Sequence, residues 1–318
     1  MAARQHKIPS GFGPHSTAAE VLRGVDLTGR LAVVTGGYSG IGLETTRALA
    51  DAGAHVLVPA RRRARAEDAV AGMDGVDVDE LDLADLASVH GFADRFLATG
   101  RSIDILINNA GIMASPETRV GPGWEAQFAT NHLGHYTLVN RLWPALTRDG
   151  TRVVQVSSNA HQFSDVHWDD IHFEHGYDKW QAYGQSKTAN ALFALQLDTL
   201  GQTSGVRAFS VHPGGIRTEL ARYMSEEEMA ELDSRLRDSP TNTGLKTPQQ
   251  GAATQVWAAT SPQLHGLGGV YCEDCDIAEP AAPDTVLGSG VKAWATDPQR
   301  AARLWQLSAE LTDIDAFG

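Results

Sequence analysis

The sequence predicts an α/β fold built on one doubly wound parallel sheet of seven strands, with helices on both faces. From residue 30 onward, short runs rich in Val and Ile alternate with longer helical stretches, which is typical of βαβ units. The first of these runs leads directly into a glycine-rich turn. No break in composition and no internal repeat divides the 318 residues, so we expect a single domain.

The strand candidates are residues 31–36, 55–60, 76–82, 103–111, 151–158, 206–214 and 268–274. Helical candidates lie between them at 42–53, 85–100 and 187–201, and the last two end at glycine, a common helix stop. We expect residues 1–29 to form an N-terminal extension, residues 30–280 the domain itself and residues 281–318 a helical tail.

Two segments interrupt this alternation. Residues 159–181 form a polar, aromatic insertion, and residues 219–248 resemble a charged helix followed by a loop with the turn residues Pro240, Asn242 and Gly244. Long insertions are usually lids or binding loops, and open α/β sheets bind ligands beyond the carboxyl ends of their strands. Since both insertions leave from such ends, we predict that residues 219–248 act as a mobile lid.

Composition excludes several classes of protein. The formal net charge of −13 and the lack of a dense Lys/Arg stripe argue against a nucleic-acid partner. No run of about 18 apolar residues could span a bilayer, and the N-terminus lacks the apolar segment of a secretory signal. We therefore expect a cytoplasmic protein that binds a small molecule, and both a monomer and a homo-oligomer stay open.

The candidates for a metal or redox site are weak. Cys272 and Cys275 form a C-x-x-C pair without the further ligands of a zinc site, so we favour strand-edge packing and keep a redox or metal role as the alternative. The histidines of the first insertion are His161, His167, His172 and His175. Their spacing fits no zinc pattern, so we expect a solvated loop and no metal. His132 and His135 are expected to pack inside the protein.

The stretch "TGGYSGIG", residues 35–42, follows the first strand and precedes a helix. Glycines remove side chains where the backbone must approach a pyrophosphate, and the helix N-terminus offers unpaired N–H groups to the same anion. This strand and helix context supports a dinucleotide site. The candidate cofactor contacts here are Gly36, Tyr38, Ser39, Gly40, Ile41 and Gly42.

In "AYGQSK", residues 182–187, Tyr183 and Lys187 lie four residues apart, so a helix would place both on one face. That spacing alone also fits two polar residues on an ordinary helix surface. A phenol with the usual pKa of about 10 is almost fully protonated at neutral pH, whereas a neighbouring ammonium favours the phenolate. The pair becomes a candidate for acid–base chemistry only if other parts of the chain support it.

The order of the motifs over about residues 30–275 resembles the short-chain dehydrogenase/reductase family. "TGGYSGIG" has the spacing T-G-x-x-x-G-x-G; it is followed by "NNAG" at 108–111, Asn131, "VSS" at 156–158, the Tyr183–Lys187 pair and "HPGGIRT" at 212–218. The resemblance implies a Rossmann-type fold. The segments "NHLGH" and "SSNAH" and the opening residues look most like the branch with retinol-dehydrogenase-like and protochlorophyllide-reductase-like enzymes.

The resemblance implies catalytic roles for four residues. Tyr183 would be the general acid/base that exchanges a proton with the substrate oxygen as hydride moves at carbon, and Lys187 would lower its pKa and hold the nicotinamide ribose. Ser158, aligned on the strand end, would polarise the substrate oxygen, with the adjacent Ser157 as the alternative. Asn131 would position a water that links Lys187 to solvent.

The resemblance also implies an NADP(H) site. Ala60 ends the second strand, where NAD-preferring relatives carry an acid, and Arg61 and Arg62 follow as forked cations suited to a 2′-phosphate. Cations oppose the dipole at a helix N-terminus, which favours a bound anion as the reason for them. The other expected contacts are Asp82 and Leu83 at the adenine, Asn108, Asn109, Ala110 and Gly111 along the cofactor, and Pro213, Gly214, Ile216 and Thr218 at the carboxamide.

We predict an NADP-dependent oxidoreductase that interconverts a carbonyl and an alcohol. Two alternatives stay open: a reductase of an activated carbon–carbon double bond that uses the same tyrosine, and a regulatory nucleotide-binding protein without turnover. Apolar residues near the two insertions favour an apolar substrate, and they are Phe163, Trp180, Leu220, Tyr223 and Met224.

Overall fold

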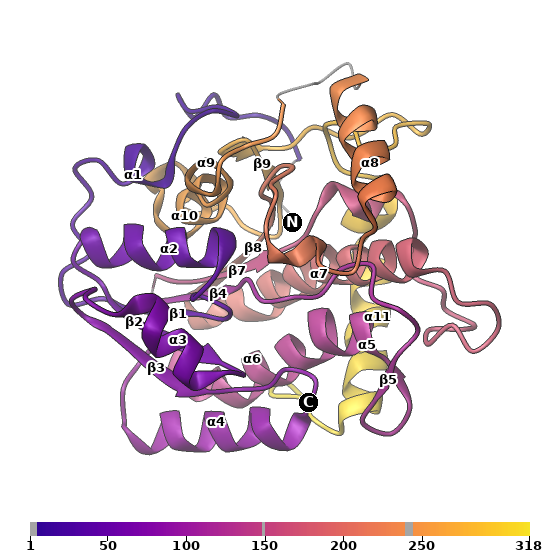
Figure 1. Ribbon diagram of the computed structural model, residues 1–318. Helices are drawn as coiled ribbons and strands as arrows, with labels where there is room; N and C mark the ends of the chain where they lie inside the picture. Colours follow the sequence, from indigo (N-terminus) through magenta and orange to yellow (C-terminus); the bar gives the residue numbers. More distant parts are fainter. Residues whose placement is uncertain (1–4, 148–149, 239–243) are drawn as a thin grey trace.

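An eight-stranded sheet forms the centre of the computed structural model, which describes residues 5–147, 150–238 and 244–318 (Figure 1). The strands are β1 Leu31–Val34, β2 His55–Ala60, β3 Val76–Glu80, β4 Ile105–Asn108, β7 Thr151–Val156, β8 Val206–His212, β9 Tyr271–Glu273 and β10 Asp276–Ile277. They lie in the order β10-β9-β8-β7-β4-β1-β2-β3, and all neighbours are parallel except β9 and β10. The predicted doubly wound sheet is confirmed, and each predicted run contains one strand.

The eighth strand, β10, results from a tight turn at the sheet edge. Asp274 and Cys275 have φ angles of 51° and 59°, the left-handed geometry that a two-residue hairpin needs at both central positions. The chain therefore folds back, and Ile277 pairs with Cys272. Since Asp-Cys is not one of the preferred pairs for such a turn, the sequence carried no hairpin signal. Both thiols are free and buried, and burial raises the pKa of each, which disfavours reactive thiolates.

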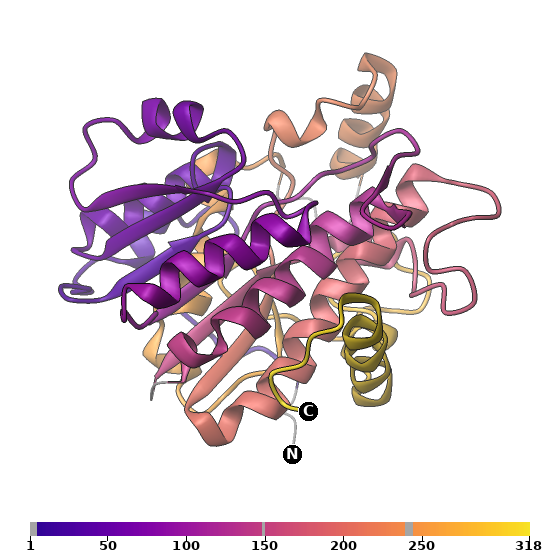
Figure 2. The ribbon, with the colours of Figure 1, turned by 90° about the horizontal axis from the view of Figure 1, so that it is seen from below.

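The principal helices are α2 Gly40–Asp51 and α10 Ala253–Thr260 on one face of the sheet, and α4 Leu86–Ala98, α6 Gly134–Leu146 and α7 Lys179–Gly201 on the other. Alternate strand residues point to opposite faces, so Val34 joins the core under α2 and α10 while Val33 joins the core under α4, α6 and α7. Figure 2 shows the second set lying across the sheet. The predicted helical cover of both faces is confirmed.

The remaining elements are shorter or peripheral. They are α1 Ala18–Val21, α3 Arg63–Val70, the hairpin of β5 Arg119–Val120 and β6 Trp124–Glu125, α5 Ala126–Phe128, the π-helical turn η1 Ala129–Leu133, α8 Glu226–Asp238, α9 Pro248–Gly251, α11 Pro298–Thr312 and the 3₁₀ turns η2 Asn159–Gln162, η3 Gln202–Ser204, η4 Glu219–Ala221, η5 Pro262–Leu264 and η6 Ala293–Thr296. The predicted lid therefore contains η4 and α8. Its turn residues Pro240 and Asn242 lie outside the described residues.

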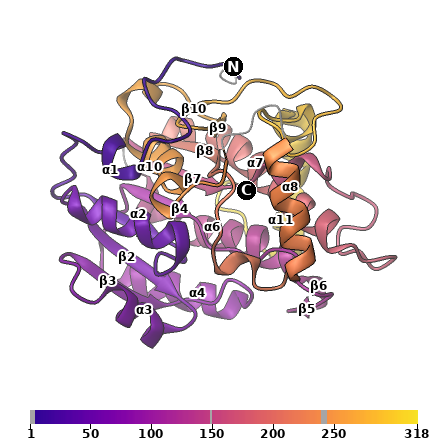
Figure 3. The same cartoon turned by 45° about the horizontal axis from the view of Figure 1, so that its top comes forward.

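Helix α8 stands beside the start of α7, as Figures 1 and 3 both show. An ion pair of 2.5 Å between Lys179 Nζ on α7 and a Glu228 carboxylate oxygen on α8 joins them. Helix α7 starts at Lys179, earlier than predicted, because the Asp178 carboxylate caps it by accepting the N–H groups of Trp180 and Gln181. Tyr183 and Lys187 therefore lie on one helix, as their spacing requires.

The sheet order creates a switch point between β1 and β4. From β1 the chain adds β2 and β3 on one side, and from β4 it adds β7, β8 and β9 on the other. Ligands of doubly wound sheets bind where the strand order reverses, beyond the carboxyl ends of the strands. The topology therefore directs the search for a site to the ends of β1 and β4.

The C-terminal helix α11 covers the outer surface of α6 and α7. The Trp305 ring stacks on Phe193 of α7 with centroids 5.7 Å apart, and it meets Tyr136 of α6 edge-on at 4.9 Å. His132 donates a hydrogen bond from Nε2 to Ser308, whose own hydroxyl donates to the Leu304 carbonyl. The tail thus forms part of the main core.

Trp305→Ala is expected to lower the free energy of unfolding by about 3 to 5 kcal/mol, the usual cost of deleting a buried large aromatic side chain. Urea denaturation monitored by circular dichroism gives the value. Phe12→Ala is the control, because Phe12 is an exposed aromatic side chain that belongs to none of the buried clusters. Equal losses in the two variants would contradict a core role for the C-terminal helix.

Candidate active site

A cavity of about 320 Å³ opens at the carboxyl ends of the strands. The predicted site residues that line it are Gly36, Tyr38, Ser39, Gly40, Ile41, Arg61, Arg62, Asp82, Leu83, Asn109, Ala110, Gly111, Ser158, Tyr183, Lys187, Pro213, Gly214, Ile216 and Thr218. Three other predicted residues, Gly42, Asn108 and Asn131, do not line the cavity and lie behind its walls. The structure therefore brings almost all of the predicted cofactor and catalytic residues to one place.

The glycine-rich turn brings the ends of β1 and β4 into contact with the first turn of α2. A Cβ on Gly36 would lie 3.1 Å from the Ala110 Cβ, and one on Gly42 would lie 2.4 Å from the Gly36 carbonyl oxygen. Gly36 and Gly40 also have φ angles of 65° and 52°, which favour glycine. The Ser39 side chain makes no capping hydrogen bond to α2, so the first N–H groups of that helix can bind an anion.

Thr35, the last residue before these glycines, holds the two strand ends together. Its Oγ1 accepts the backbone N–H groups of Asn109 and Ala110 at 2.9 and 3.0 Å. The Asn109 amide nitrogen donates back to the Thr35 carbonyl at 2.9 Å. His135 Nε2 lies 3.0 Å from the same Thr35 hydroxyl. This buried histidine therefore supports the loop after β4, residues 109–114, which we call the cofactor loop for its predicted role, and sequence spacing did not reveal this contact.

Tyr183 and Lys187 face the cavity from α7. Lys187 Nζ lies 5.6 Å from the centre of the Tyr183 ring and donates a hydrogen bond of 3.1 Å to the Val156 carbonyl. Burial lowers the pKa of Lys187 to about 7. Burial also raises the pKa of the Tyr183 phenol, and a hydrogen bond with Ser158 opposes only part of that change. Protein groups alone therefore favour a neutral phenol, and the expected lowering of the Tyr183 pKa stays a prediction that depends on added positive charge.

The two adjacent serines point in different directions. Ser157 Oγ is buried and donates to the Lys187 carbonyl at 2.7 Å, so it supports α7. Ser158 lines the cavity and hydrogen-bonds the Tyr183 phenol. Gly184 makes this meeting possible, because a Cβ there would lie 2.9 Å from the Ala160 carbonyl oxygen and would push the chain after Ser158 away from α7.

Asn131 lies in the π-helical turn η1 and holds the cofactor loop from behind. Its side chain accepts the Ile112 N–H and donates to the Ile112 carbonyl, both at 2.9 Å, and it donates to Ser186 Oγ at the same distance. Its carbonyl accepts from His135 Nδ1 at 3.0 Å. Gly111 separates the Asn131 side chain from the cavity. A Cβ at Gly111 would lie 3.0 Å from Asn131 Oδ1 and 3.8 Å from Lys187 Nζ. A water relay through Asn131 stays a prediction.

Arg61 and Arg62 follow the end of β2 as expected and line the cavity. Within the ranges that the structure describes, neither forms an ion pair, whereas Arg63 pairs with Glu67 and Arg65 pairs with Glu219. Two cations without a protein partner remain beside the cavity. They are available to an anionic group of a ligand.

The loop "PGGI" after β8 is supported by a lysine that the sequence did not reveal. The aliphatic part of Lys246 lies so close to Gly214 that a Cβ there would clash at 2.6 Å, and Gly214 has a φ of 101°. Lys246 Nζ is buried and pairs with Asp274 at 2.6 Å. Its backbone N–H donates to the Gly215 carbonyl at 2.8 Å. Lys246, near the end of the predicted lid, thus holds the loop of residues 213–216, which is predicted to bind the carboxamide.

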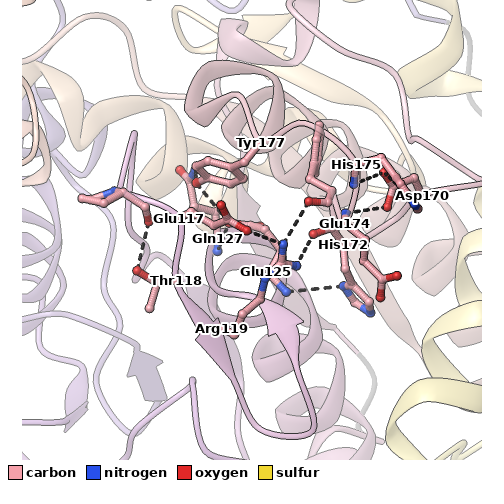
Figure 4. Close-up of polar contacts among 12 residues, drawn as sticks. Glu117, Thr118, Arg119, Glu125, Gln127, Asp170, His172, Glu174, His175 and Tyr177 are labelled. Carbon is pink, nitrogen blue, oxygen red and sulfur yellow. Dashed lines mark hydrogen bonds and ion pairs between the residues drawn. The ribbon is translucent and has the colours of Figure 1, made fainter.

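The histidines of the first insertion are dispersed, as Figure 4 shows for two of them. His172 approaches the backbone of Glu125, and His175 lies beside Asp170. Arg119 of the β5–β6 hairpin donates to the carbonyls of His172 and Phe173 and so ties the insertion down. No group of three or more metal-ligating residues was found among the described residues.

Next to the same hairpin, a buried polar cluster joins the cofactor loop to the start of α7, and Figure 4 shows its residues Glu125, Gln127 and Tyr177. The Gln127 amide nitrogen donates to the Tyr177 hydroxyl and to the Lys179 carbonyl, both at 3.0 Å, and its oxygen accepts the Ala114 N–H at 2.8 Å. The buried Glu125 carboxylate accepts two backbone N–H groups, and burial raises its pKa. This cluster fixes the insertion against the wall of the cavity.

Part of the cavity wall is apolar, although Arg217, Glu219, Arg222 and Asp233 also line the cavity. The apolar side chains come from the cofactor loop, the first insertion, the predicted lid and the C-terminal segment, and they are Met113, Phe163, Trp180, Leu220, Met224, Met229, Leu232, Leu245 and Leu287. Phe163 and Trp180 meet edge-on at 6.2 Å. Tyr223, also predicted near the substrate, does not line the cavity; it is exposed and lies beneath the Arg222 guanidinium.

The chain is similar to proteins of known family. The family model described as short chain dehydrogenase matches residues 30–229. A probable oxidoreductase of Streptomyces lividans is 44% identical over 90% of this chain and 98% of its own length, and mouse retinol dehydrogenase 11 is 36% identical over 91% and 88%. The crystal structure of an uncharacterised protein from Mycobacterium paratuberculosis, 34% identical, superposes with a TM-score of 0.73 over 96% of this chain and 99% of that one.

Lys187→Met is expected to stabilise the fold, because it removes a buried cation while the Val156 carbonyl keeps its hydrogen bond from Asn190. The folded lysine has a pKa of about 7, against 10.5 for the exposed group. The wild type therefore loses stability as the pH falls from about 10.5 to about 7 and no further below that. The advantage of the variant should follow the same course, reaching at most about 5 kcal/mol at one pKa unit per 1.36 kcal/mol.

Urea unfolding of both proteins at pH 6.5 and 9.5 measures this difference. Lys179→Met is the control, since the Lys179 side chain is partly exposed and lies in an ion pair with Glu228 at the contact between α7 and α8. An advantage of Lys187→Met that did not shrink at the higher pH would count against a strained buried ammonium.

Proposed function

The chain belongs to the short-chain dehydrogenase family, and we propose that it is an NADP-dependent oxidoreductase that interconverts a carbonyl and an alcohol. The observation that carries this proposal is the meeting of the Tyr183 phenol and the Ser158 hydroxyl in the cavity that the glycine-rich turn also lines. A proton donor and a second hydroxyl are thereby aimed at one point beside a dinucleotide-binding turn. Such a pair suits a substrate oxygen that gains or loses a proton.

The residues present fit NADP(H). The positions of Gly36 and Gly40 leave backbone open to the pyrophosphate, and the N-terminus of α2 offers it N–H groups. Lys187 would hold the ribose next to the ring. The adenine contacts would be Asp82 and Leu83, and the carboxamide contacts would come from the loop Pro213–Thr218. When bound, the cofactor supplies or accepts the hydride.

In the direction of reduction, Tyr183 gives its proton to the substrate oxygen and Ser158 donates a hydrogen bond to that oxygen. Lys187 carries the charge that makes this possible, because a nearby ammonium stabilises the phenolate that remains. Its pKa of about 7 lets it take up or release a proton near neutral pH. In oxidation the same groups act in reverse.

We also propose an apolar substrate and a mobile lid. The nine apolar side chains of this part of the cavity wall come from four chain segments. Among the charged residues that also line the cavity, Arg217 pairs with Asp233 and Glu219 pairs with Arg65. Residues 219–248 supply several of them and would order over bound ligands, within a catalytic domain of residues 30–280. The described residues contain no helix with the length and hydropathy of a membrane span, and we propose a cytoplasmic location.

Tyr183→Phe is expected to reduce turnover of a ketone with NADPH by about 10²- to 10⁴-fold, since the proton donor is lost. Cofactor affinity, measured by fluorescence titration, should stay nearly unchanged. A variant that retained more than about a tenth of the wild-type rate would contradict the assignment of Tyr183. A wild-type protein that reduced no ketone of a broad panel would refute the proposed reaction.

Arg61→Ala is expected to weaken NADPH binding by roughly 10- to 100-fold, the value of a charge-assisted hydrogen bond, and to leave NADH binding almost unchanged. Titration of both cofactors provides the measurement. Arg63→Ala is the matched control, because Arg63 lies two residues further on but pairs with Glu67. Equal losses for the two cofactors, or a wild-type preference for NADH, would overturn the assignment of NADP.

A further inference from the structure

A segment near the C-terminus, residues 287–292, lies against the chain that leaves the candidate catalytic serine. The 3₁₀ turn η2, Asn159–Gln162, starts directly after Ser158. Three of its four residues direct polar side chains to this segment, and they are Asn159, His161 and Gln162. The segment is outside residues 30–229, the part of the chain that matches the family model.

The hydrogen bonds fix the segment at several successive residues. Asn159 donates to the Leu287 carbonyl at 3.1 Å. The Gln162 amide donates to the carbonyls of Gly288 and Gly290 at 3.0 Å and accepts the Gly288 N–H at 3.1 Å. The Gln162 side chain therefore forms hydrogen bonds with the backbone on both sides of residue 289.

The opposite side of the segment is held as firmly. The buried Glu273 of β9 accepts the Gly290 N–H with both oxygens, at 2.9 and 3.0 Å, and accepts the Ser289 hydroxyl. His161 Nε2 accepts the Lys292 N–H at 3.1 Å, while its Nδ1 donates to the Ser158 carbonyl at 2.7 Å. The position of the segment is thus tied to the serine itself.

Leu287 is held in an unfavourable backbone conformation. Its φ is 56°, in the left-handed region that is unfavourable for a residue with a Cβ. Glycine would avoid this cost, so the side chain needs another reason to be there. Leu287 is 8% exposed and lines the cavity with Ser158 and Tyr183, whereas its neighbour Val286 is 58% exposed.

We propose that Leu287 is a specificity-determining residue: a fixed apolar wall that limits the bulk of the carbonyl substrate next to the reacting oxygen. The inference rests on the proposed carbonyl–alcohol reaction and names the element that selects its substrates. A lid that moves could adapt to substrates of different size, but a wall held at residues 287, 288, 290 and 292 cannot. Substrates with a small group on this side of the carbonyl are therefore preferred over bulky homologues.

The test compares acetophenone with benzophenone. Both ketones carry one phenyl group, and benzophenone carries a second phenyl ring where acetophenone carries a methyl group. Leu287→Ala is expected to raise kcat/KM for benzophenone relative to acetophenone by about tenfold or more, since a change of one methylene in an apolar pocket alters selection by about 10- to 200-fold. Leu287→Gly should act in the same direction and also relieves the strained φ, so it serves if the alanine variant fails to fold. Val286→Ala is the matched control and should leave the ratio unchanged.

Calorimetric binding of the two ketones to each variant with NADP⁺ present separates this inference from the proposed function. If the wild type turns over neither ketone, the proposed reaction fails for this class, and the binding ratio still decides the role of Leu287. An unchanged ratio in Leu287→Ala and Leu287→Gly, a change of equal size in Val286→Ala, or no binding of either ketone to any variant would overturn the proposal.

Discussion

The close approach of three backbone segments at the ends of β1 and β4 is the constraint on which the site depends. A Cβ at Gly42 would clash with the Gly36 carbonyl at 2.4 Å and with the Asn109 side chain at 2.5 Å, so α2 can start where it does only without side chains there. Thr35 then closes the contact by accepting two N–H groups of the neighbouring loop. This arrangement aims the N-terminus of α2 at the cavity and places Gly111 beside Lys187.

Burial sets the acid–base properties of Tyr183 and Lys187 and makes this pair costly for the fold. The same desolvation lowers the pKa of Lys187 and raises that of Tyr183, so both groups favour their neutral forms in the protein by itself. A cationic nicotinamide would change this balance toward the phenolate, because charges interact strongly where water is excluded. In the proposed reaction, proton transfer would thereby depend on the bound cofactor, while the buried Lys187 lowers the stability of the fold.

The sequence predicted the strands and the glycine-rich turn well because these signals are local. Each strand run was placed, but several were drawn too long: Thr35, Ala110, Ser158 and Pro213 were assigned to strands and lie just beyond them. These overruns are residues that line the cavity, because the ligand site of a doubly wound sheet lies just beyond the carboxyl ends of its strands. The contacts of His135, Lys246 and Leu287 could not be predicted, because each depends on a partner distant in the chain.

This division between local and distant contacts also separates the two halves of the site. The predicted cofactor side consists of turns in which close backbone contacts require glycine. Few other residues can therefore replace these glycines. The substrate side is assembled from the insertion, the predicted lid and the C-terminal segment, which meet only in the folded protein. There Gln162 and Glu273 bind backbone groups of the C-terminal segment, so its side chains can change while its path is kept. For the proposed reaction, selectivity would therefore vary through positions such as Leu287 while Ser158 and Tyr183 keep their places, because the anchors and the proposed reacting groups belong to different residues.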